Sequence, residues 1–218
     1  MNIRIEDIRA VGDGAEAELS IEISNGEETQ RIKGKVSAAM LSDLALPASV
    51  RSPIVLTRAR CEEILRCMKL HAAVKKGIDL LGYAKNTPRA LQNKLKTKGY
   101  PADIAEQAVC FLVEKGYIRE SDDAFLFAEN LAVRKHYGKN RIQKEMFAKG
   151  FSGDVIRETL DVLDVDFSEI CAARIDSMGG ISLLEAPERR QKTVAALLRY
   201  GFSYAEIREA QSLLKEKE

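Results

Sequence analysis

The chain has 218 residues, of which 45% are hydrophobic and 31% charged, so it is long enough to form one or two domains with buried cores. Lys and Arg total 34 against 33 Asp and Glu, and this net charge of +1 excludes a global field that would attract DNA or an anionic membrane. No apolar run approaches the roughly 18 residues of a membrane span, and the start of the chain lacks the apolar stretch of a signal peptide. We therefore expect a soluble cytoplasmic protein without membrane contact, whose binding surfaces are local patches.

Cysteine and histidine are too few and too scattered for the common metal and nucleophile sites. The four cysteines are Cys61, Cys67, Cys110 and Cys171. None forms a CxxC pair, and we expect all four to be small buried apolar residues. The two histidines, His71 and His136, are far apart, and the sequence contains no HExxH, GxSxG or GxxxxGK[ST] motif. The sequence thus predicts a protein that is not an enzyme, with no catalytic residues, no metal and no cofactor.

The N-terminal part differs in composition from the rest, because all thirteen Phe and Tyr lie between Tyr83 and Tyr204. Hydrophobic residues alternate in three short stretches, as in half-buried strands: Ile3 and Ile5; Leu19, Ile21 and Ile23; Ile32 and Val36. Gly12-Asp13-Gly14 and Asn25-Gly26 provide turn residues between them. Residues 1–56 are therefore predicted to be a β-rich region with a small antiparallel sheet.

Two helices are predicted where this region ends. Residues 37–46 have the pattern of a short helix that Pro47 ends. Thr57 is placed to cap a second helix, which carries Ile64, Leu65 and Met68. We interpret residues 57–69 as a connecting helix that leads into the next part of the chain.

From about residue 70 the sequence repeats itself. Segments 95–112, 146–163 and 197–214 align without gaps, and their glycines, Gly99, Gly150 and Gly201, are 51 residues apart. Glycine after an apolar helical stretch supplies the left-handed conformation that ends a helix. Nine equivalent positions are predicted to be buried: Leu95, Met146 and Leu197; Tyr100, Phe151 and Phe202; Leu112, Leu163 and Leu214. Each unit thus contains a helix, a glycine corner and another helix.

A further helical stretch precedes each of these pairs, which predicts three repeats over residues 70–118, 119–164 and 165–218. No unit can bury both of its faces alone, so the units should stack. The predicted fold class is mainly α: a small N-terminal antiparallel β element followed by three tandem three-helix repeats that form a curved solenoid-like body. With helices about 10 Å wide, that body would be roughly 60 Å long.

Basic residues gather at the same place in the first two repeats. Residues 85–98 contain five Lys and Arg and no acid, and residues 134–149 contain six against Glu145 alone. Such a run is often only a solvated helix face, but its recurrence favours a surface that a partner neutralises. The candidate partner-binding residues are Lys94, Lys98, Arg134, Lys135, Lys139, Arg141, Lys144 and Lys149.

Acidic residues and three tyrosines leave alternatives open. Acids gather near Glu120 and between Asp161 and Glu169, where they either meet the dipoles of helix N-termini, the reading we prefer, or form a carboxylate pair. Tyr83, Tyr117 and Tyr137 are expected in the core, although they could instead stack on bases beside the lysines.

The repeats resemble a known family at three places in order. Repeat 2 follows the pattern G..R[IL]..EL..KG[IF] at Gly138, Arg141, Ile142, Glu145, Lys149, Gly150 and Phe151, with Met146 in place of the common Leu. Repeat 1 is similar to the pattern [ST]...L..KL..KG[FY] at Thr87, Leu91, Lys94, Leu95, Lys98, Gly99 and Tyr100. Repeat 3 has the ending GFSY..I at residues 201–207. Over residues 70–216 the chain thus resembles the RecX regulators of bacterial homologous recombination.

The resemblance implies a non-enzymatic protein that modulates the RecA recombinase. Such a protein would lie in the groove of the RecA nucleoprotein filament and lower its ATPase and strand-exchange activities, with weak direct DNA contact, in recombination, DNA repair and the SOS response. We expect a monomer. The alternative function is a stand-alone nucleic-acid-binding helical repeat module, in which the basic residues track phosphates.

Overall fold

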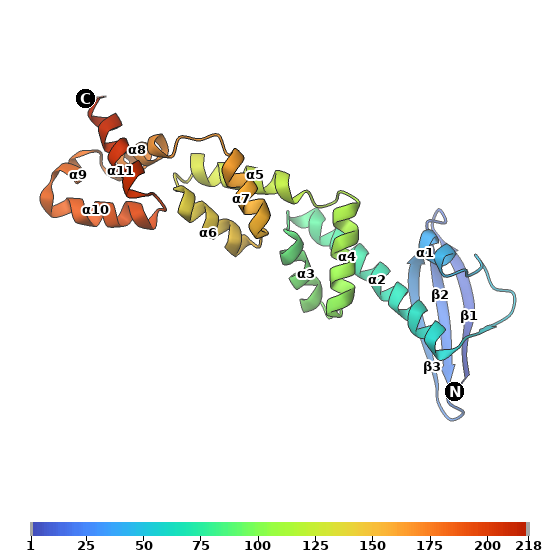
Figure 1. Cartoon of the computed structure of the whole chain (residues 1–218). Helices are drawn as coiled ribbons and strands as arrows, with labels where there is room; N and C mark the ends of the chain where they lie inside the picture. The colour runs from blue at the N-terminus through green and yellow to red at the C-terminus, as the bar shows by residue number, and fades with distance from the viewer. Residues whose placement is uncertain (1, 217–218) are drawn as a thin grey trace. The chain divides into compact units, whose positions relative to one another are not determined.

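A computed structural model describes residues 2–216, in which an N-terminal antiparallel sheet is followed by helices (Figure 1). The chain divides into two compact bodies. The first comprises the chain up to Asn86 together with Leu91–Ile118, and the second comprises Thr87–Ala90 together with the chain from Arg119 onward. The predicted fold class, mainly α with an N-terminal antiparallel β element and three-helix repeats, is confirmed.

The long strands and the main helices follow one another in the predicted order. The strands are β1 (Asn2–Val11), β2 (Glu16–Ser24), β3 (Thr29–Ser37) and β4 (Ile54–Val55). The helices up to repeat 1 are α1 (Ala38–Asp43), α2 (Arg58–Tyr83), α3 (Pro88–Thr97) and α4 (Ala102–Glu114). Those that follow are α5 (Glu120–Val133), α6 (Lys139–Lys149), α7 (Gly153–Val162), α8 (Phe167–Met178), α9 (Ser182–Glu185), α10 (Pro187–Arg199) and α11 (Tyr204–Lys215).

The strands within the described residues form one antiparallel sheet in the order β3-β2-β1-β4. Ile5 pairs with Ile21, and Ile21 pairs with Ile32, so the alternating hydrophobic residues of the three long strands share one face. Ile5 and Ile21 are fully buried there. The three long strands are therefore as predicted. The short strand β4 was not predicted, because two residues carry no alternation and only their pairing with Arg4 and Ile5 of β1 makes them a strand.

The helix α1 is shorter than the predicted helix 37–46. Ser37 begins it, because its hydroxyl oxygen accepts a backbone N–H of the first turn. The chain then leaves the helix at Ala45, whose φ of +46° lies in the left-handed region. Pro47 therefore lies beyond the end of the helix and does not terminate it.

The helix α2 connects the sheet to repeat 1 within the first body (Figure 1). Thr57 caps it as predicted. Ile64, in its first half, belongs to the hydrophobic core beneath the sheet, whereas Ala73, in its second half, belongs to the core formed with α3 and α4. The helix runs without a break across residue 70, so the predicted connecting helix and the first helix of repeat 1 are one element.

Three main helices make up each predicted repeat: α2, α3 and α4, then α5, α6 and α7, then α8, α10 and α11. The third repeat also contains the one-turn helix α9. Because of this insertion, its first helix does not keep the spacing of 51 residues from the first helix of repeat 2. The predicted left-handed glycines are confirmed, with φ of +92° at Gly99 and +96° at both Gly150 and Gly201. No helix in residues 2–216 combines the length and the apolar composition needed to cross a membrane.

Eight of the nine predicted core positions are buried: Leu95, Met146, Leu197, Phe151, Phe202, Leu112, Leu163 and Leu214. The exception is Tyr100, which is half-buried. Its hydroxyl donates a hydrogen bond of 3.2 Å to the carbonyl oxygen of Ala72, so the ring must keep its polar end at the edge of the core. The equivalent Phe151 and Phe202 have no hydroxyl and can be enclosed.

The prediction that all four cysteines are buried is wrong in part. Cys110 is exposed and Cys67 is half-buried, whereas Cys61 and Cys171 are buried, and burial raises the pKa of the Cys171 thiol to about 12. The buried side of α4 is formed by residues three or four positions apart from one another, Leu112 among them. Cys110 does not belong to this stripe, so its side chain points outward.

The prediction that three tyrosines lie in the core is also wrong in part. Tyr83 and Tyr117 are exposed, because they lie at the end of α2 and beyond the end of α4, outside the buried stripe of either helix. Tyr137 is half-buried, and its ring contacts other side chains of the second body.

A buried histidine links α2 to the sheet. The Nε2 atom of His71 is 3.2 Å from Oε1 of Glu16, and the same oxygen accepts a hydrogen bond of 2.6 Å from Lys75. Burial lowers the pKa of His71 below its ordinary value of 6.5, although the Glu16 carboxylate acts in the opposite direction. The bond from Lys75 lowers the pKa of Glu16 below its ordinary 4.5. His71 is therefore neutral in the folded protein near pH 7.

We expect the free energy of unfolding to fall as the pH is lowered from about 7 to about 5. The folded-state pKa of His71 lies below that of the unfolded chain, so below pH 6.5 protons bind the unfolded state more readily and favour it. Glu16 adds to this loss only below about pH 4.5, outside the window. Urea titrations at several pH values should show a smaller slope for His71→Gln than for the wild type. Equal slopes would contradict the assignment.

Candidate partner-binding surface

The predicted contact residues lie in both bodies. Lys94 and Lys98, on α3 and just after it, belong to the first body. The other six belong to the second body: Arg134 and Lys135 between α5 and α6, and Lys139, Arg141, Lys144 and Lys149 on α6. That the two sets act as one surface stays a prediction.

The cations of α6 point in different directions around the helix. Ile142 and Met146 are fully buried and define its inner side. At 3.6 residues per turn, Lys144 lies almost opposite that side, and Lys139 lies about 140° away from Lys144. Lys139 Nζ is 3.9 Å from Oδ1 of Asp161 on α7, so its charge is partly balanced within the protein. Lys144 faces outward, clear of the buried side of the helix.

Arg141 is part of the packing of the second body. Its guanidinium lies 3.9 Å from the centre of the Tyr137 ring and 5.2 Å from that of Tyr200, and its Nε is 3.5 Å from a carboxylate oxygen of Glu145. Arg174 covers the Tyr200 ring at 3.7 Å. Cation–π contacts of this kind stabilise by roughly 0.5–2 kcal/mol. Changing the charge of Arg141 would therefore disturb the packing of the second body.

Lys94 also has a structural contact. Its ammonium donates a hydrogen bond of 2.5 Å to the side-chain oxygen of Asn86. The amide nitrogen of Asn86 donates in turn to the carbonyl oxygens of Leu80 and Ala84, at the C-terminal end of α2. Lys94 thus helps to hold the buried Asn86 in place, whereas Lys98 is simply exposed.

The remaining cations are available for a partner. Arg134, Lys135, Lys144 and Lys149 are exposed. Among the residues that the structure describes, Lys144 and Lys149 form no ion pair, and Lys149 occupies the last turn of α6 next to its left-handed glycine. These four residues, together with Lys139, we call the α6 basic surface.

Most of these acidic residues lie at helix N-termini, as the preferred interpretation of the sequence predicted. Asp166 caps α8 by accepting N–H groups of Ser168 and Glu169, and Glu120, in the first turn of α5, accepts the N–H of Ser152 at 3.0 Å. Asp161 is an exception, because it lies in the last turn of α7. Within residues 2–216 no three His, Cys, Asp or Glu side chains come together as a metal site.

One exposed aromatic residue was missed in the sequence. Phe147 on α6 is 62% exposed, and the Arg89 guanidinium lies 5.9 Å from the centre of its ring. Its place on the helix could have revealed it, since Phe147 is out of phase with the buried Ile142 and Met146. The α6 basic surface therefore has an apolar neighbour on the same helix.

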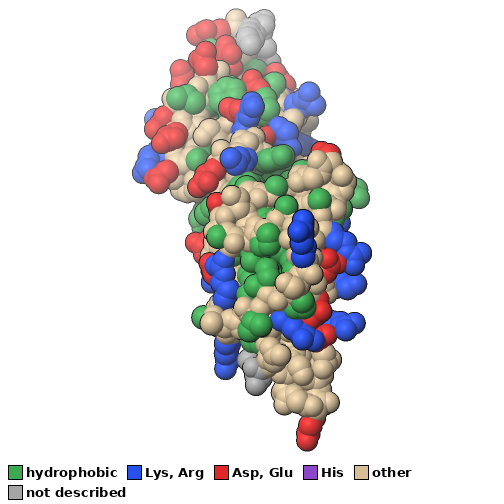
Figure 2. All heavy atoms as spheres, turned by 90° about the vertical axis from the view of Figure 1, so that its right-hand side faces the viewer, with side chains coloured by type: hydrophobic (Ala, Val, Ile, Leu, Met, Phe, Trp, Pro, Cys, Tyr) green, Lys and Arg blue, Asp and Glu red, His purple; other side chains and the backbone are tan. Residues whose placement is uncertain are grey.

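The sheet carries mixed charge on the face away from its core. Arg4 and Arg31 donate hydrogen bonds of 2.7 and 3.0 Å to the two carboxylate oxygens of Glu22, and these bonds, first that of Arg4, lower its pKa. On the side that Figure 2 shows, Lys and Arg side chains lie among Asp and Glu around a central hydrophobic area. The visible side therefore presents no continuous basic patch.

Comparisons with known proteins agree with one another. No protein-family model matches the sequence. The chain is 31% identical over 116 residues to the regulatory protein RecX of Clostridium botulinum (strain Eklund 17B / Type B), a match that spans 51% of that relative and 53% of this chain. It is 30% identical over 141 residues to the regulatory protein RecX of Vibrio vulnificus (strain CMCP6), and this match covers 88% of the relative and 62% of this chain.

Solved structures show the same fold. A crystal structure of regulatory protein RecX matches 96% of this chain and 99% of its own with a TM-score of 0.73 at 16% identity. The crystal structure of RecX from Lactobacillus salivarius matches 67% of this chain and 97% of its own with a TM-score of 0.60 at 17% identity. With the match that covers 88% of the Vibrio relative, these findings show that the chain belongs to the RecX family of regulatory proteins.

Proposed function

We propose that this protein regulates the RecA recombinase by binding in the groove of its nucleoprotein filament, and that it lowers the ATPase and strand-exchange activities of the filament. Membership of the RecX family carries this proposal. The exposed α6 basic surface supports it, because a filament that contains DNA offers negative charge to cations such as Lys144 and Lys149, which form no ion pair among the described residues. The role requires no catalysis by the regulator.

In this proposal the protein acts by occupying the groove of the filament. A protein with several three-helix repeats can contact more than one filament subunit. Such contacts shift the filament between its states only in so far as the protein binds one state more tightly than the other. Inhibition then means tighter binding to a state with low ATPase activity. The sheet of the first body serves an additional positioning role.

The experiment that tests the proposal compares two targets for the purified protein. Its affinity for a bare DNA strand and for the same strand coated with recombinase is measured at two salt concentrations, beside the ATPase rate of the filament. We expect preference for the coated strand, a lowered ATPase rate and no turnover by the protein alone. Equal affinity for the two targets, with steep salt dependence, would instead identify a stand-alone nucleic-acid-binding module.

The triple variant Lys135→Glu, Lys144→Glu and Lys149→Glu should bind the filament about 100-fold more weakly, since each rim contact is worth about 1 kcal/mol and three contacts change sign. Arg141 is left intact because it packs against Tyr137. Helical content should stay, because Glu and Lys have similar helix propensities. The ATPase inhibition curve and the circular dichroism spectrum of the variant provide the measurement.

The matched control reverses three exposed cations outside this surface, Lys69, Arg189 and Lys192. It changes the net charge by the same amount and should inhibit at the wild-type concentration. If the two triple variants inhibit equally well, the α6 basic surface is only a solvated helix face.

A further inference from the structure

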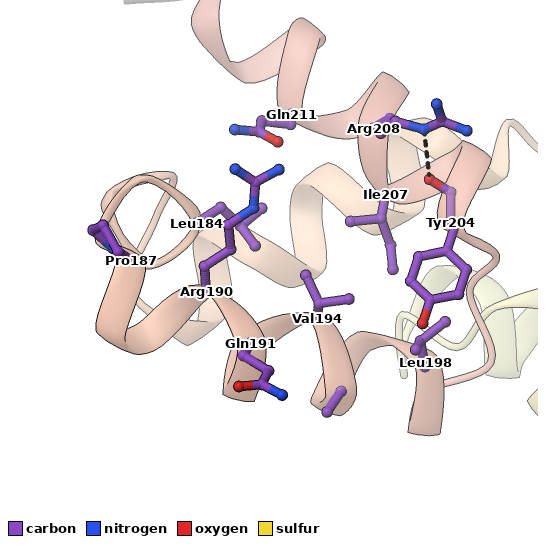
Figure 3. Close-up of a pocket in the computed structure, with 11 residues that line it drawn as sticks. Leu184, Pro187, Arg190, Gln191, Val194, Leu198, Tyr204, Ile207, Arg208 and Gln211 are labelled. Atoms are coloured by element: carbon purple, nitrogen blue, oxygen red, sulfur yellow. Dashed lines mark hydrogen bonds between the residues drawn. The ribbon is translucent and has the colours of Figure 1, made fainter.

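An open groove runs between α10 and α11 in the third repeat (Figure 3). Its volume is about 790 Å³, within the range of ligand and peptide sites. Its apolar lining includes Val194 and Leu198 from α10, Ile207 from α11 and Leu184 from α9. In Figure 3 the ring of Tyr204, 63% exposed, extends toward Leu198 at one end of the groove. A solvent-accessible hollow of this kind is apolar surface without a partner inside the described protein.

The groove is a feature of the repeat and not an isolated irregularity. A smaller hollow of about 340 Å³ lies between α6 and α7 in repeat 2. Five of its six lining residues stand 51 positions before lining residues of the larger groove: Gln143, Lys144, Phe147, Gly153 and Ile156 precede Val194, Ala195, Leu198, Tyr204 and Ile207. In repeat 3 the helix α9 adds a wall with Leu184, and the groove there is the larger of the two.

The rim of the larger groove is positively charged. Arg190 and Arg208 are both exposed lining residues, and the lining contains no Asp or Glu. The Nε of Arg208 donates a hydrogen bond of 3.4 Å to the carbonyl oxygen of Tyr204, while Figure 3 shows the Arg190 guanidinium extending toward Gln211. An occupant that carries acidic groups beside apolar ones would match both the floor and the rim.

The dimensions of the groove suit a helix. The α10 wall extends from Pro187 to Leu198, about 16 Å at 1.5 Å per residue. Side chains at positions i and i+7 of a docked helix are about 10 Å apart, so two or three anchors fit along the floor. Aliphatic side chains form most of that floor, whereas bases need aromatic faces on which to stack, and Tyr204 is the aromatic residue of the lining. The chemistry thus favours a peptide over a single-stranded nucleic acid.

We propose that the groove between α10 and α11 binds an acidic amphipathic helix of a partner protein, with aliphatic anchors against Val194 and Ile207 and carboxylates beside Arg190 and Arg208. The site is distinct from the α6 basic surface. The proposal does not depend on which protein supplies the helix, so it stands or falls separately from the proposed regulation of RecA.

The test uses the full chain with isotope-labelled methyl groups and three synthetic peptides of about 14 residues, a length that can form a helix once it is docked. All three carry Leu at i, i+3 and i+7, and the remaining positions are mostly Glu, Gln or Lys. The Glu peptide should shift the methyl resonances of Val194, Leu198 and Ile207 at about tenfold lower concentration than the Lys peptide. No shift at about 1 mM Glu peptide, or equal shifts with Glu and Lys peptides, would overturn the proposal.

Two single substitutions on α10 make the result specific. Ala195 is an exposed lining residue, so Ala195→Glu places a carboxylate at the groove without touching the core, and it should weaken binding of the Glu peptide about tenfold. Lys192→Gln, at an exposed position outside the lining, makes the same change of one charge unit and should leave binding unchanged. Equal affinities of the two variants would count against the groove.

An oligothymidylate of about 15 nucleotides is added in a separate titration, because basic grooves with an aromatic residue also bind single strands. It should leave the methyl groups of the groove unshifted. If it shifts them at lower concentration than the Glu peptide does, the groove is a nucleic-acid site and the peptide proposal fails.

Discussion

Phe151→Ala should lower the free energy of unfolding by about 3–5 kcal/mol. The ring is 5% exposed and packs in one hydrophobic cluster with Ile142 and Met146. Its centre lies 5.7 Å from that of the Phe127 ring, so truncation removes an aromatic contact as well as leaving a cavity. Urea denaturation followed by circular dichroism measures the change.

Phe147→Ala is the matched control. Phe147 lies four residues earlier and makes the same chemical change, but its ring is 62% exposed and leaves no cavity when it is removed. We expect a loss below about 1 kcal/mol, as for most exposed substitutions. Similar losses at the two positions would show that the corner aromatic of repeat 2 does not hold the core.

Gly201→Ala should destabilise the protein by about 2–5 kcal/mol, the sum of left-handed strain and overpacking. The φ of Gly201 is +96°, and an added Cβ would lie 2.6 Å from Cβ of Arg141 and 2.8 Å from the carbonyl oxygen of Gly138. Hydrogen bonds of 2.9 Å from Gly138 N–H to the Tyr200 carbonyl and 3.2 Å from Asn140 N–H to the Gly201 carbonyl join the two segments. The new methyl group would push them apart.

The equivalent glycine of repeat 1 separates the two causes. Gly99 has a φ of +92°, but an added Cβ would meet nothing within 4 Å. Gly99→Ala should therefore cost only the strain, about 1–2 kcal/mol. Thermal or urea unfolding of the two variants gives the comparison. If they lose the same stability, the close approach at Gly201 has no energetic importance.

The sequence by itself determined the repeat architecture. A period of 51 residues placed a helix end, a glycine and an aromatic residue at equivalent positions, and the left-handed glycines and eight of nine buried residues followed. Capping by Thr57 could also be predicted from the sequence, because caps and corners depend on a few neighbouring residues. The candidate cations were also found in the sequence, since charge runs are visible without a structure.

Only the tertiary structure decided which of those cations are free to act. Arg141 contacts Tyr200 and Lys94 contacts Asn86, whereas Lys144 makes no ion pair among the described residues. The burial of a long side chain depends on residues distant in the chain, which no local pattern specifies. The groove of repeat 3 could not be predicted from the sequence for the same reason. Its lining combines residues of α10 and α11 with Leu184 of α9, and no single helix forms it.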